Sequence, residues 1–183
     1  AVALRQPRMT LLAAISRLLE REAIPHAAIG AAALAVHGVA RSTEDLDLLV
    51  LEPRVLDKRI WQDIRGSGAL VELRPGDADD PLLGVVRVTG ALERPVDLVV
   101  GRSSWQQGIL VRAAPGVVDG VSIPVAAPAD LILLKLYAGG SGDAWDIEQL
   151  ILSRPADLIR EVESRLPELP ADARAHWARI RAS

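Results

Sequence analysis

The chain has 183 residues, a formal net charge of −3 and a pI near 5.6. Half of its residues are apolar and a quarter are charged, which excludes a wholly disordered chain and predicts one domain of ordinary size, or one domain with a small appendage. The absence of cysteine excludes disulfides, thiolate metal sites and a cysteine nucleophile. No apolar run reaches the roughly 20 residues of a membrane-spanning helix, so we expect a soluble protein. Residues 1–8 hold no apolar stretch of signal-peptide length, so we expect a cytoplasmic protein in which they form a tail.

The first two-thirds of the chain alternates between helical and strand-like patterns. Apolar residues recur at helical spacing from Thr10 to Glu22, which predicts a first helix that Pro25 ends. Short apolar runs bounded by Gly, Pro and Asp follow, and this pattern is typical of strands. We expect strands at residues 26–29, 46–51, 69–73, 83–89 and 96–100, and helices at residues 31–36, 54–65 and 103–112.

The last third is expected to be helical after one hairpin. Asp119-Gly120 is a strong turn signal and predicts a hairpin over residues 117–125. Helical spacing then predicts helices at residues 129–137, 141–152, 155–166 and 171–180. This order favours an α/β or α+β fold. We expect a sheet domain at residues 1–127 and a C-terminal helical part at residues 128–183 that packs on it or forms a small lobe.

Two acids stand two residues apart, Asp45 and Asp47, at the start of an expected strand. Their side chains leave the same face of a strand. Two like charges side by side repel each other unless a cation lies between them, and Mg²⁺ prefers oxygen ligands that it often shares with phosphates. The pair is therefore a candidate Mg²⁺ site, with a solvated turn as the alternative.

Two more residues extend this candidate site. Gly30 follows the expected strand 26–29, where a glycine lets the backbone approach a ligand and the helix start beyond it offers N–H groups to a phosphate. Asp97 begins another apolar strand. If that strand lies beside the first, Asp97 joins the other two acids around one or two metal ions. The alternative is a strand-end acid that faces water.

Cations must accompany these acids, because three carboxylates alone would repel a ligand that carries phosphate. Arg41 precedes the acids, and Lys135 lies in an expected helix. The 21 basic residues comprise 19 Arg and 2 Lys, so a lysine retained at position 135 indicates that arginine would not serve there. The alternative is a lysine whose stem covers the edge of an apolar helix.

The order of these residues resembles the signature of the DNA polymerase beta-like nucleotidyltransferase superfamily: a glycine after a strand, an Asp-x-Asp pair and a later strand acid. The chain is similar in particular to a branch of small bacterial proteins akin to abortive-infection toxins. Members of this branch carry an Arg-x-Thr-x-Asp-x-Asp stretch and a helical Lys-Leu-x-Ala segment followed by acids. The matching residues are Arg41, Thr43, Asp45 and Asp47, then Lys135, Leu136, Tyr137 and Ala138 with Asp143 and Asp146.

The resemblance implies a mixed sheet flanked by helices and Mg²⁺ as cofactor, with a two-metal site. It also implies transfer of a nucleoside monophosphate from an NTP to an acceptor hydroxyl, with release of pyrophosphate. The acceptor is left open between RNA, a protein hydroxyl and a small molecule. The implied catalytic residues and metal ligands are Asp45, Asp47 and Asp97. The implied nucleotide-binding residues are Gly30, Ala31, Arg41, Thr43 and Lys135.

Two positions depart from the family pattern. The family usually has Gly-Gly or Gly-Ser where this chain has Gly30-Ala31, and a basic residue often stands at the position of Gly142. These departures keep a second hypothesis open, in which the chain is a catalytically silent binding or regulatory module of a toxin–antitoxin pair, with a cognate antitoxin as partner. Metal dependence separates the two hypotheses.

The remaining unusual residues are expected to be structural. His37 is expected to pack or cap, and no His or acid cluster has zinc-ligand spacing. The four tryptophans lie in expected helices, where packing in the core or at an interface explains them.

Overall fold

The computed structural model describes residues 9–140, 142–153 and 155–182. The tail expected at residues 1–8 and the first residue of the helix expected at residues 141–152 lie outside the described residues. The chain forms two compact units: one comprises the residues up to His26 together with Glu44–Arg102, and the other comprises Ala27–Thr43 together with the residues from Ser103 onward. These units do not follow the expected boundary between residues 127 and 128, which stays a prediction.

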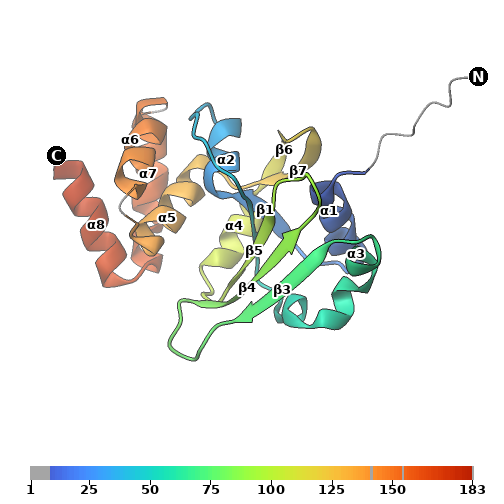
Figure 1. Ribbon diagram of the computed structural model, residues 1–183. Helices are drawn as coiled ribbons and strands as arrows, with labels where there is room; N and C mark the ends of the chain where they lie inside the picture. The colour runs from blue at the N-terminus through green and yellow to red at the C-terminus, as the bar shows by residue number, and fades with distance from the viewer. Residues whose placement is uncertain (1–8, 141, 154, 183) are drawn as a thin grey trace, which may run out of the picture. The chain divides into compact units, whose positions relative to one another are not determined.

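The first unit contains four strands of a mixed sheet together with helical segments. Its strand order is β3-β4-β5-β2. Figure 1 labels β3, β4 and β5 of these strands. β2 and β5 are parallel, whereas β4 is antiparallel to both β3 and β5. The elements are α1 (Leu11–Arg21), β2 (Leu46–Val50), β3 (Leu70–Pro75), β4 (Leu82–Thr89) and β5 (Val96–Gly101).

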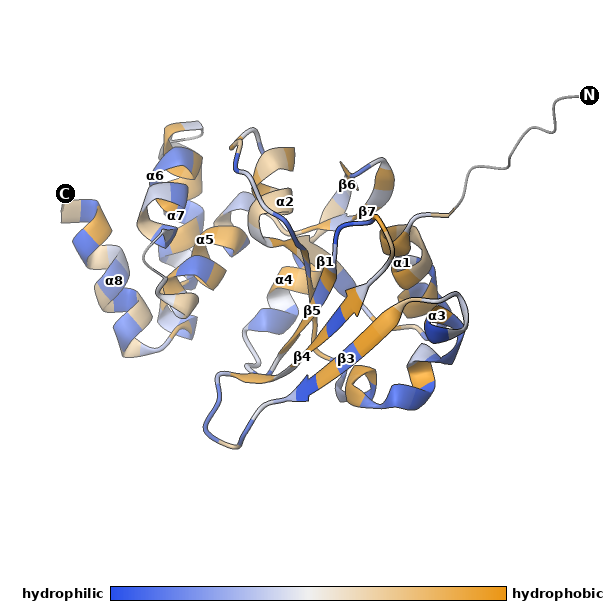
Figure 2. Ribbon diagram, in the orientation of Figure 1, coloured by the Kyte–Doolittle hydropathy of each residue, from blue (hydrophilic) through white to orange (hydrophobic). Residues whose placement is uncertain are grey.

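The hydrophobic spacing of the sequence explains these elements. The apolar face of α1 is buried, and the hydroxyl of Thr10 accepts a hydrogen bond from the N–H of Ala13 at 3.2 Å, which caps the helix. Buried residues alternate along β4, as expected for a strand with one face on a core. Figure 2 shows that the strands of this unit are mainly hydrophobic.

One expected helix, over residues 54–65, is broken into three short pieces. They are the 3₁₀ turns η1 (Pro53–Leu56) and η2 (Lys58–Trp61) and the helix α3 (Gln62–Gly66). The break lies at Asp57, whose backbone is extended and whose carboxylate accepts a hydrogen bond from the N–H of Arg59 at 2.9 Å. A side chain that bonds to nearby backbone N–H groups competes with a continuous helix. The helical periodicity is therefore correct, but the helix is interrupted.

The strands of the second unit follow the order β1-β7-β6. β1 is parallel to β7, and β6 and β7 form the expected hairpin around Asp119 and Gly120. Both turn residues have positive φ, as a two-residue hairpin turn requires. The elements are β1 (His26–Ile29), α2 (Gly30–Val36), α4 (Gln106–Arg112), β6 (Ala114–Val118) and β7 (Val121–Val125).

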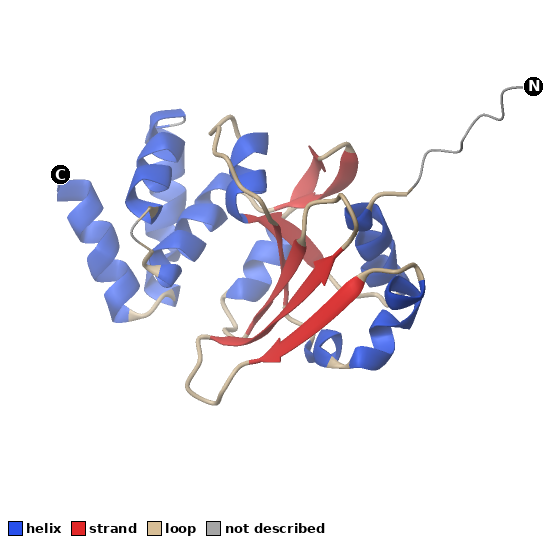
Figure 3. Cartoon of the chain, in the orientation of Figure 1, coloured by secondary structure: helices blue, strands red, loops and turns tan. Residues whose placement is uncertain are grey.

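The residues described after β7 form four long helices, as expected. Figure 3 shows these helices in blue, joined by loops in tan. α5 contacts α2 and each of the other three helices, so it forms the centre of this part. The helices are α5 (Pro128–Ala138), α6 (Asp143–Ser153), α7 (Pro155–Arg165) and α8 (Ala171–Ala182), with a 3₁₀ turn, η3 (Leu166–Glu168), before α8. The expected fold class, a mixed sheet flanked by helices with a C-terminal helical part, is confirmed.

Among the described residues, we find no helix that combines the length and the apolar character needed to cross a membrane.

Candidate active site

Three charged residues occupy one register position on three neighbouring strands of the first unit. Asp47 on β2 is the partner of Asp97 on the parallel strand β5, and Asp97 is in turn the partner of Arg87 on β4. Directly opposed residues of neighbouring strands lie on the same face of a sheet. The strand of Asp97 is therefore the neighbour of the strand of Asp47, which is the condition that the sequence analysis set for a shared site.

Arg87 joins two of the three acids. Its Nη1 lies 2.7 Å from Oδ2 of Asp97, and its Nη2 lies 3.0 Å from Oδ1 of Asp45, the residue that precedes β2. Nη1 lies 3.4 Å from Oδ2 of Asp45, so both carboxylate oxygens of Asp45 face the same guanidinium. Arg94 adds a hydrogen bond from its Nη2 to the backbone carbonyl of Asp45 at 3.3 Å. The carboxylates of Asp45 and Asp97 therefore flank one cationic group.

The side chains of Arg87, Asp45 and Asp97 are partly buried. The exposed fraction of the side chain is 28% for Arg87, 34% for Asp45 and 16% for Asp97. Burial raises the pKa of Asp97 above its usual 3.8; the charge of Arg87 opposes this rise and the carboxylate of Asp45 adds to it. Oδ1 of Asp97 is buried and accepts no hydrogen bond. One buried oxygen at this site therefore lacks a hydrogen-bond partner in the metal-free protein.

The donor set fits a hard divalent cation. All the candidate ligands are carboxylates, and a buried carboxylate oxygen without a hydrogen bond is a position that a cation can fill. Within residues 9–140, 142–153 and 155–182, however, no group of three or more His, Asp or Glu side chains is arranged to hold a metal ion. The expected convergence of Asp45, Asp47 and Asp97 around Mg²⁺ stays a prediction, and the charge between Asp45 and Asp97 is supplied by Arg87.

Sequence reasoning missed Arg87. A signal was present, because Arg87 is the only charged residue in the apolar run at residues 82–89. A single charge in the middle of a buried strand needs a partner. The partner could not be identified before the register of β4 and β5 was known.

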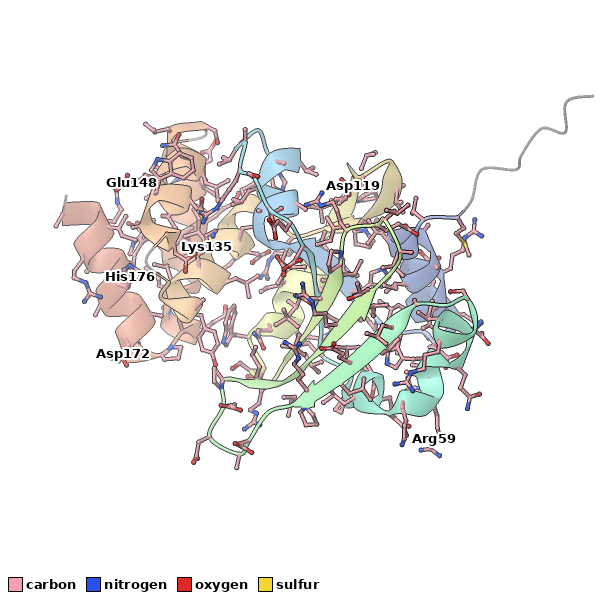
Figure 4. The ribbon with its side chains drawn as sticks, in the orientation of Figure 1. Arg59, Asp119, Lys135, Glu148, Asp172 and His176 are labelled. Atoms are coloured by element: carbon pink, nitrogen blue, oxygen red, sulfur yellow. The ribbon has the colours of Figure 1, made fainter. Side chains whose placement is uncertain are left out.

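A second charged cluster lies within the second unit, around Asp146 of α6. Nζ of Lys135, on α5, lies 2.5 Å from Oδ2 of Asp146 and 2.9 Å from Oδ1 of Asp143. Arg41 donates to the same Oδ2 of Asp146. The side chain of Lys135 on α5 is labelled in Figure 4, where the reader can locate this cluster. The cluster of Arg41, Lys135, Asp143 and Asp146 therefore brings together residues that sequence analysis matched to two separate motifs.

Asp146 is the centre of this cluster. Its side chain is fully buried, whereas 40% of the Arg41 side chain and 14% of the Lys135 side chain are exposed. Burial opposes ionisation of Asp146, but hydrogen bonds from Arg41 and Lys135 outweigh it and lower the pKa of this carboxyl. The other oxygen of Asp146, Oδ1, accepts no hydrogen bond. Asp146 is therefore a carboxylate that holds two cationic side chains in place.

The side chain of Arg41 lies beside Gly142, one of the two positions at which the sequence departs from the family pattern. A Cβ atom built on Gly142 would lie 3.1 Å from Nη2 of Arg41. The guanidinium of Arg41 thus fills the space beside Gly142, and a side chain there would have to move it. Arg41 therefore places a positive charge beside position 142.

The other expected nucleotide-binding residues, Gly30, Ala31 and Thr43, lie in the second unit. Gly30 has φ +65° and forms the turn from β1 to α2, and Ala31 lies in the first turn of this seven-residue helix. Thr43 lies in the segment between α2 and β2. Their nucleotide-binding role stays a prediction.

Residues that the sequence analysis regarded as structural have structural contacts. Nε2 of His37 donates a hydrogen bond to the carbonyl of Ala126 at 2.8 Å. Trp61 is fully buried and donates from Nε1 to the carbonyl of Val55 at 2.7 Å. Trp105 and Trp177 are also buried, whereas Trp145 is half-exposed on α6.

An open hollow on the first unit contains none of the candidate site residues. It is lined by charged side chains that pair with one another, including Arg21 with Asp63 at 2.9 Å and Arg59 with Asp57 at 2.5 Å. Arg59 is labelled in Figure 4. Because these charged side chains are paired with each other, we assign no functional role to the hollow.

Comparison with known proteins identifies the fold. No family model and no curated protein matches the sequence. Among solved structures, the antibiotic-resistance factor ANT(2″)-Ia in solution is similar with a TM-score of 0.55 and 13% identity over 94% of each chain. The crystal structure of ANT(2″)-Ia with adenylyl-2″-tobramycin gives a TM-score of 0.51 and 17% identity, over 94% of this chain and 95% of that one.

A third similar structure is TM1012 from Thermotoga maritima, a protein provisionally assigned as a nucleotidyltransferase. Its TM-score is 0.50 and its identity 14%, over 79% of this chain and 92% of that one. At these identities the similarity establishes the fold alone. The chain has the nucleotidyltransferase fold, and its place in the abortive-infection toxin-like branch stays a prediction.

Proposed function

We propose that this protein transfers a nucleoside monophosphate from an NTP to an acceptor hydroxyl, with Mg²⁺ as cofactor. The observation that carries the proposal is the register of Asp47 with Asp97 on neighbouring strands, with Asp45 and Asp97 on either side of Arg87. The fold supports it, because a structure of the same fold holds an adenylylated antibiotic. Carboxylates on one face of a sheet are the ligands that nucleotidyl transfer needs.

The three acids would hold the cofactor. When bound, Mg²⁺ neutralises charge on the transferring phosphate and aligns the attacking and leaving oxygens. Asp97 would also accept the proton of the acceptor hydroxyl, a role proposed on the family resemblance. The acceptor oxygen forms a bond to the α-phosphorus, the bond from that phosphorus to the bridging oxygen breaks, and pyrophosphate leaves with the electron pair.

Arg41 and Lys135 would balance the charge of the triphosphate. Asp146 holds both side chains, and 40% of the Arg41 side chain stays exposed. A guanidinium with one edge fixed by a carboxylate can present its other edge to a phosphate. Gly30, Ala31 and Thr43 are proposed as further nucleotide-binding residues on the family resemblance.

Incubation with α-³²P-labelled NTPs tests the proposal. The protein, Mg²⁺ and each labelled NTP are combined in turn with aminoglycosides, lincosamides, RNA and a bacterial lysate, and labelled products are separated. Transfer that EDTA abolishes and that Asp97→Asn lowers by about 100-fold or more supports the proposal. Asp172→Asn, an exposed acid of α8 labelled in Figure 4, is the control and keeps full activity. Absence of any labelled product together with absence of NTP binding by calorimetry overturns it.

The silent-module hypothesis has one specific observation in its favour. The carboxylates of Asp45 and Asp97 already share a cationic partner in Arg87, so the chain itself offsets part of their charge. On this hypothesis the protein binds a cognate antitoxin and neither Mg²⁺ nor NTP. Calorimetric titration with Mg²⁺ and with NTP separates the two hypotheses, since the enzyme needs both ligands.

A further inference from the structure

We propose that Arg87 is an exchangeable counter-ion of the active-site carboxylates: it partly neutralises Asp45 and Asp97 in the metal-free protein, and a divalent cation binds both acids only by displacing it. The inference rests on the proposed function for the identity of the metal ligands, and it adds a residue that controls access to them.

The contacts of Asp45 carry the first step. Both of its carboxylate oxygens lie within hydrogen-bonding distance of Arg87, Oδ1 at 3.0 Å from Nη2 and Oδ2 at 3.4 Å from Nη1. A metal ion needs carboxylate oxygens at roughly 2.0–2.6 Å and approaches along the lone pairs that these N–H groups use. A cation that uses Asp45 as a ligand therefore competes with Arg87.

The contacts of Asp97 carry the second step. Its Oδ2 accepts from Arg87 at 2.7 Å, while its Oδ1 is buried without a hydrogen bond. Because Oδ1 is buried and Oδ2 is bonded to Arg87, a cation that uses Asp97 as a ligand requires Arg87 to move. One oxygen of Asp97 is thus bonded to Arg87 and the other has no partner. A carboxylate in this state can exchange its guanidinium partner for a metal ion that also satisfies the second oxygen.

The charges along the strands provide a position for the released guanidinium. Arg87 has a second acidic neighbour in its row, because its partner on the antiparallel strand β3 is Glu72. The row across β2, β5, β4 and β3 thus reads Asp47, Asp97, Arg87, Glu72. Loss of the contacts to Asp45 and Asp97 leaves Arg87 beside another carboxylate, so its displacement does not leave an isolated charge.

Mn²⁺ is the probe for this exchange, since it takes carboxylate ligands as Mg²⁺ does and its free-ion EPR signal disappears on binding. The variants are Arg87→Met, which removes the charge, and Arg87→Lys, which keeps one charge but cannot bond to both acids in the same way. The matched control is Arg59→Met. Arg59 lies on η2 and pairs with Asp57 at 2.5 Å, so its removal changes the net charge equally and leaves Glu72 paired with Arg74.

We expect Arg87→Met to bind Mn²⁺ about tenfold more tightly than the unaltered protein, and Arg87→Lys to lie between the two. Arg59→Met should change the affinity by no more than about twofold, because its ion pair is with Asp57. Without metal, Arg87→Met should unfold at a lower temperature than the unaltered protein, and Mn²⁺ should restore the difference. Equal or weaker Mn²⁺ binding by Arg87→Met overturns the inference.

Two further outcomes separate this inference from the proposed function. Tighter Mn²⁺ binding by Arg87→Met without any nucleotidyl transfer sustains the counter-ion role and removes the enzyme. Absence of Mn²⁺ binding by every variant overturns both. Should Arg87→Met fail to fold, the unaltered protein is titrated with Mg²⁺ while the NMR signals of its arginine Nε–H groups are recorded. The signal of Arg87 is assigned as the one that Arg87→Lys lacks. This signal must shift on titration, and a signal that stays unchanged at saturation contradicts the exchange.

Discussion

Asp47 and Asp97 are register partners on the parallel strands β2 and β5, although most of the first unit separates them along the chain. Neighbouring strands lie about 4.8 Å apart, so the two carboxylates are adjacent like charges on one sheet face. Such a pair destabilises a sheet unless a cation compensates it. Arg87, one strand further on, contacts Asp97 and so reduces this cost.

The relationship predicts the behaviour of Asp47→Asn. Without metal, this variant should be as stable as the unaltered protein or more so, because the change removes repulsion between adjacent carboxylates. Labelled transfer should fall by about 100-fold or more, because a ligand is lost. Thermal unfolding followed by circular dichroism, alongside the radiolabel assay, checks both parts. A variant that loses cooperative unfolding would identify Asp47 as a structural residue instead.

Lys135→Met should destabilise the second unit. The substitution leaves the fully buried carboxylate of Asp146 with one cationic partner in place of two. Breaking one ion pair of a buried carboxylate costs about 1–3 kcal/mol of unfolding free energy. Urea unfolding measures the cost. Lys58→Met is the matched control, because Lys58 is exposed on η2, and it should change the unfolding free energy by less than about 0.5 kcal/mol.

The outcome at Lys135 also decides between its two interpretations from the sequence. A lysine whose stem only covers an apolar edge would tolerate Met, since Met keeps the apolar stem. A cost close to that of the control would therefore favour this interpretation. A cost several times larger would show that the ammonium group itself is needed.

Much of the fold followed from local pattern. β1 begins and ends where the apolar run His26–Ile29 does, because buried strands leave an uninterrupted hydrophobic signal. The prediction of a single helix at residues 54–65 was wrong. The hydrogen bond that the N–H of Arg59 donates to the Asp57 carboxylate interrupts the helix that the hydrophobic periodicity predicts there. Local competition of this kind leaves only a weak signal, an Asp inside a helical pattern.

The candidate site was predictable in its residues but not in its pairings. Asp45, Asp47 and Asp97 each carry a local signal, an acid at the start of an apolar strand. The role of Arg87 depends on the register between β4 and β5, and a shift of one residue would place it on the other face. Register is set by tertiary packing, so no window of sequence contains it.

Gly30→Ala tests the turn between β1 and α2. Gly30 has φ +65°, a left-handed conformation that costs a residue with a Cβ about 1–2 kcal/mol. We expect a loss of about 1 kcal/mol in the free energy of urea unfolding. Gly66→Ala is the matched control, because the space around Gly66 is open and its backbone is not left-handed. Equal effects of the two substitutions would contradict a conformational requirement at Gly30.

His26 should make the protein less stable in mild acid. Burial lowers the pKa of His26 below its usual 6.5, against smaller opposing effects of the Ile24 carbonyl and Glu20. Its Nε2 lies 3.0 Å from Oγ of Ser16, and its Nδ1 donates to the carbonyl of Ile24 at 3.2 Å, which suits the neutral ring. As pH falls below about 6.5, His26 becomes protonated in the unfolded chain while it stays neutral in the folded chain. The free energy of unfolding therefore falls by up to about 1.4 kcal/mol per pH unit. Urea unfolding between pH 7.5 and pH 5 should show this slope in His176→Gln and a reduced slope in His26→Gln, whereas equal slopes would remove His26 as the cause.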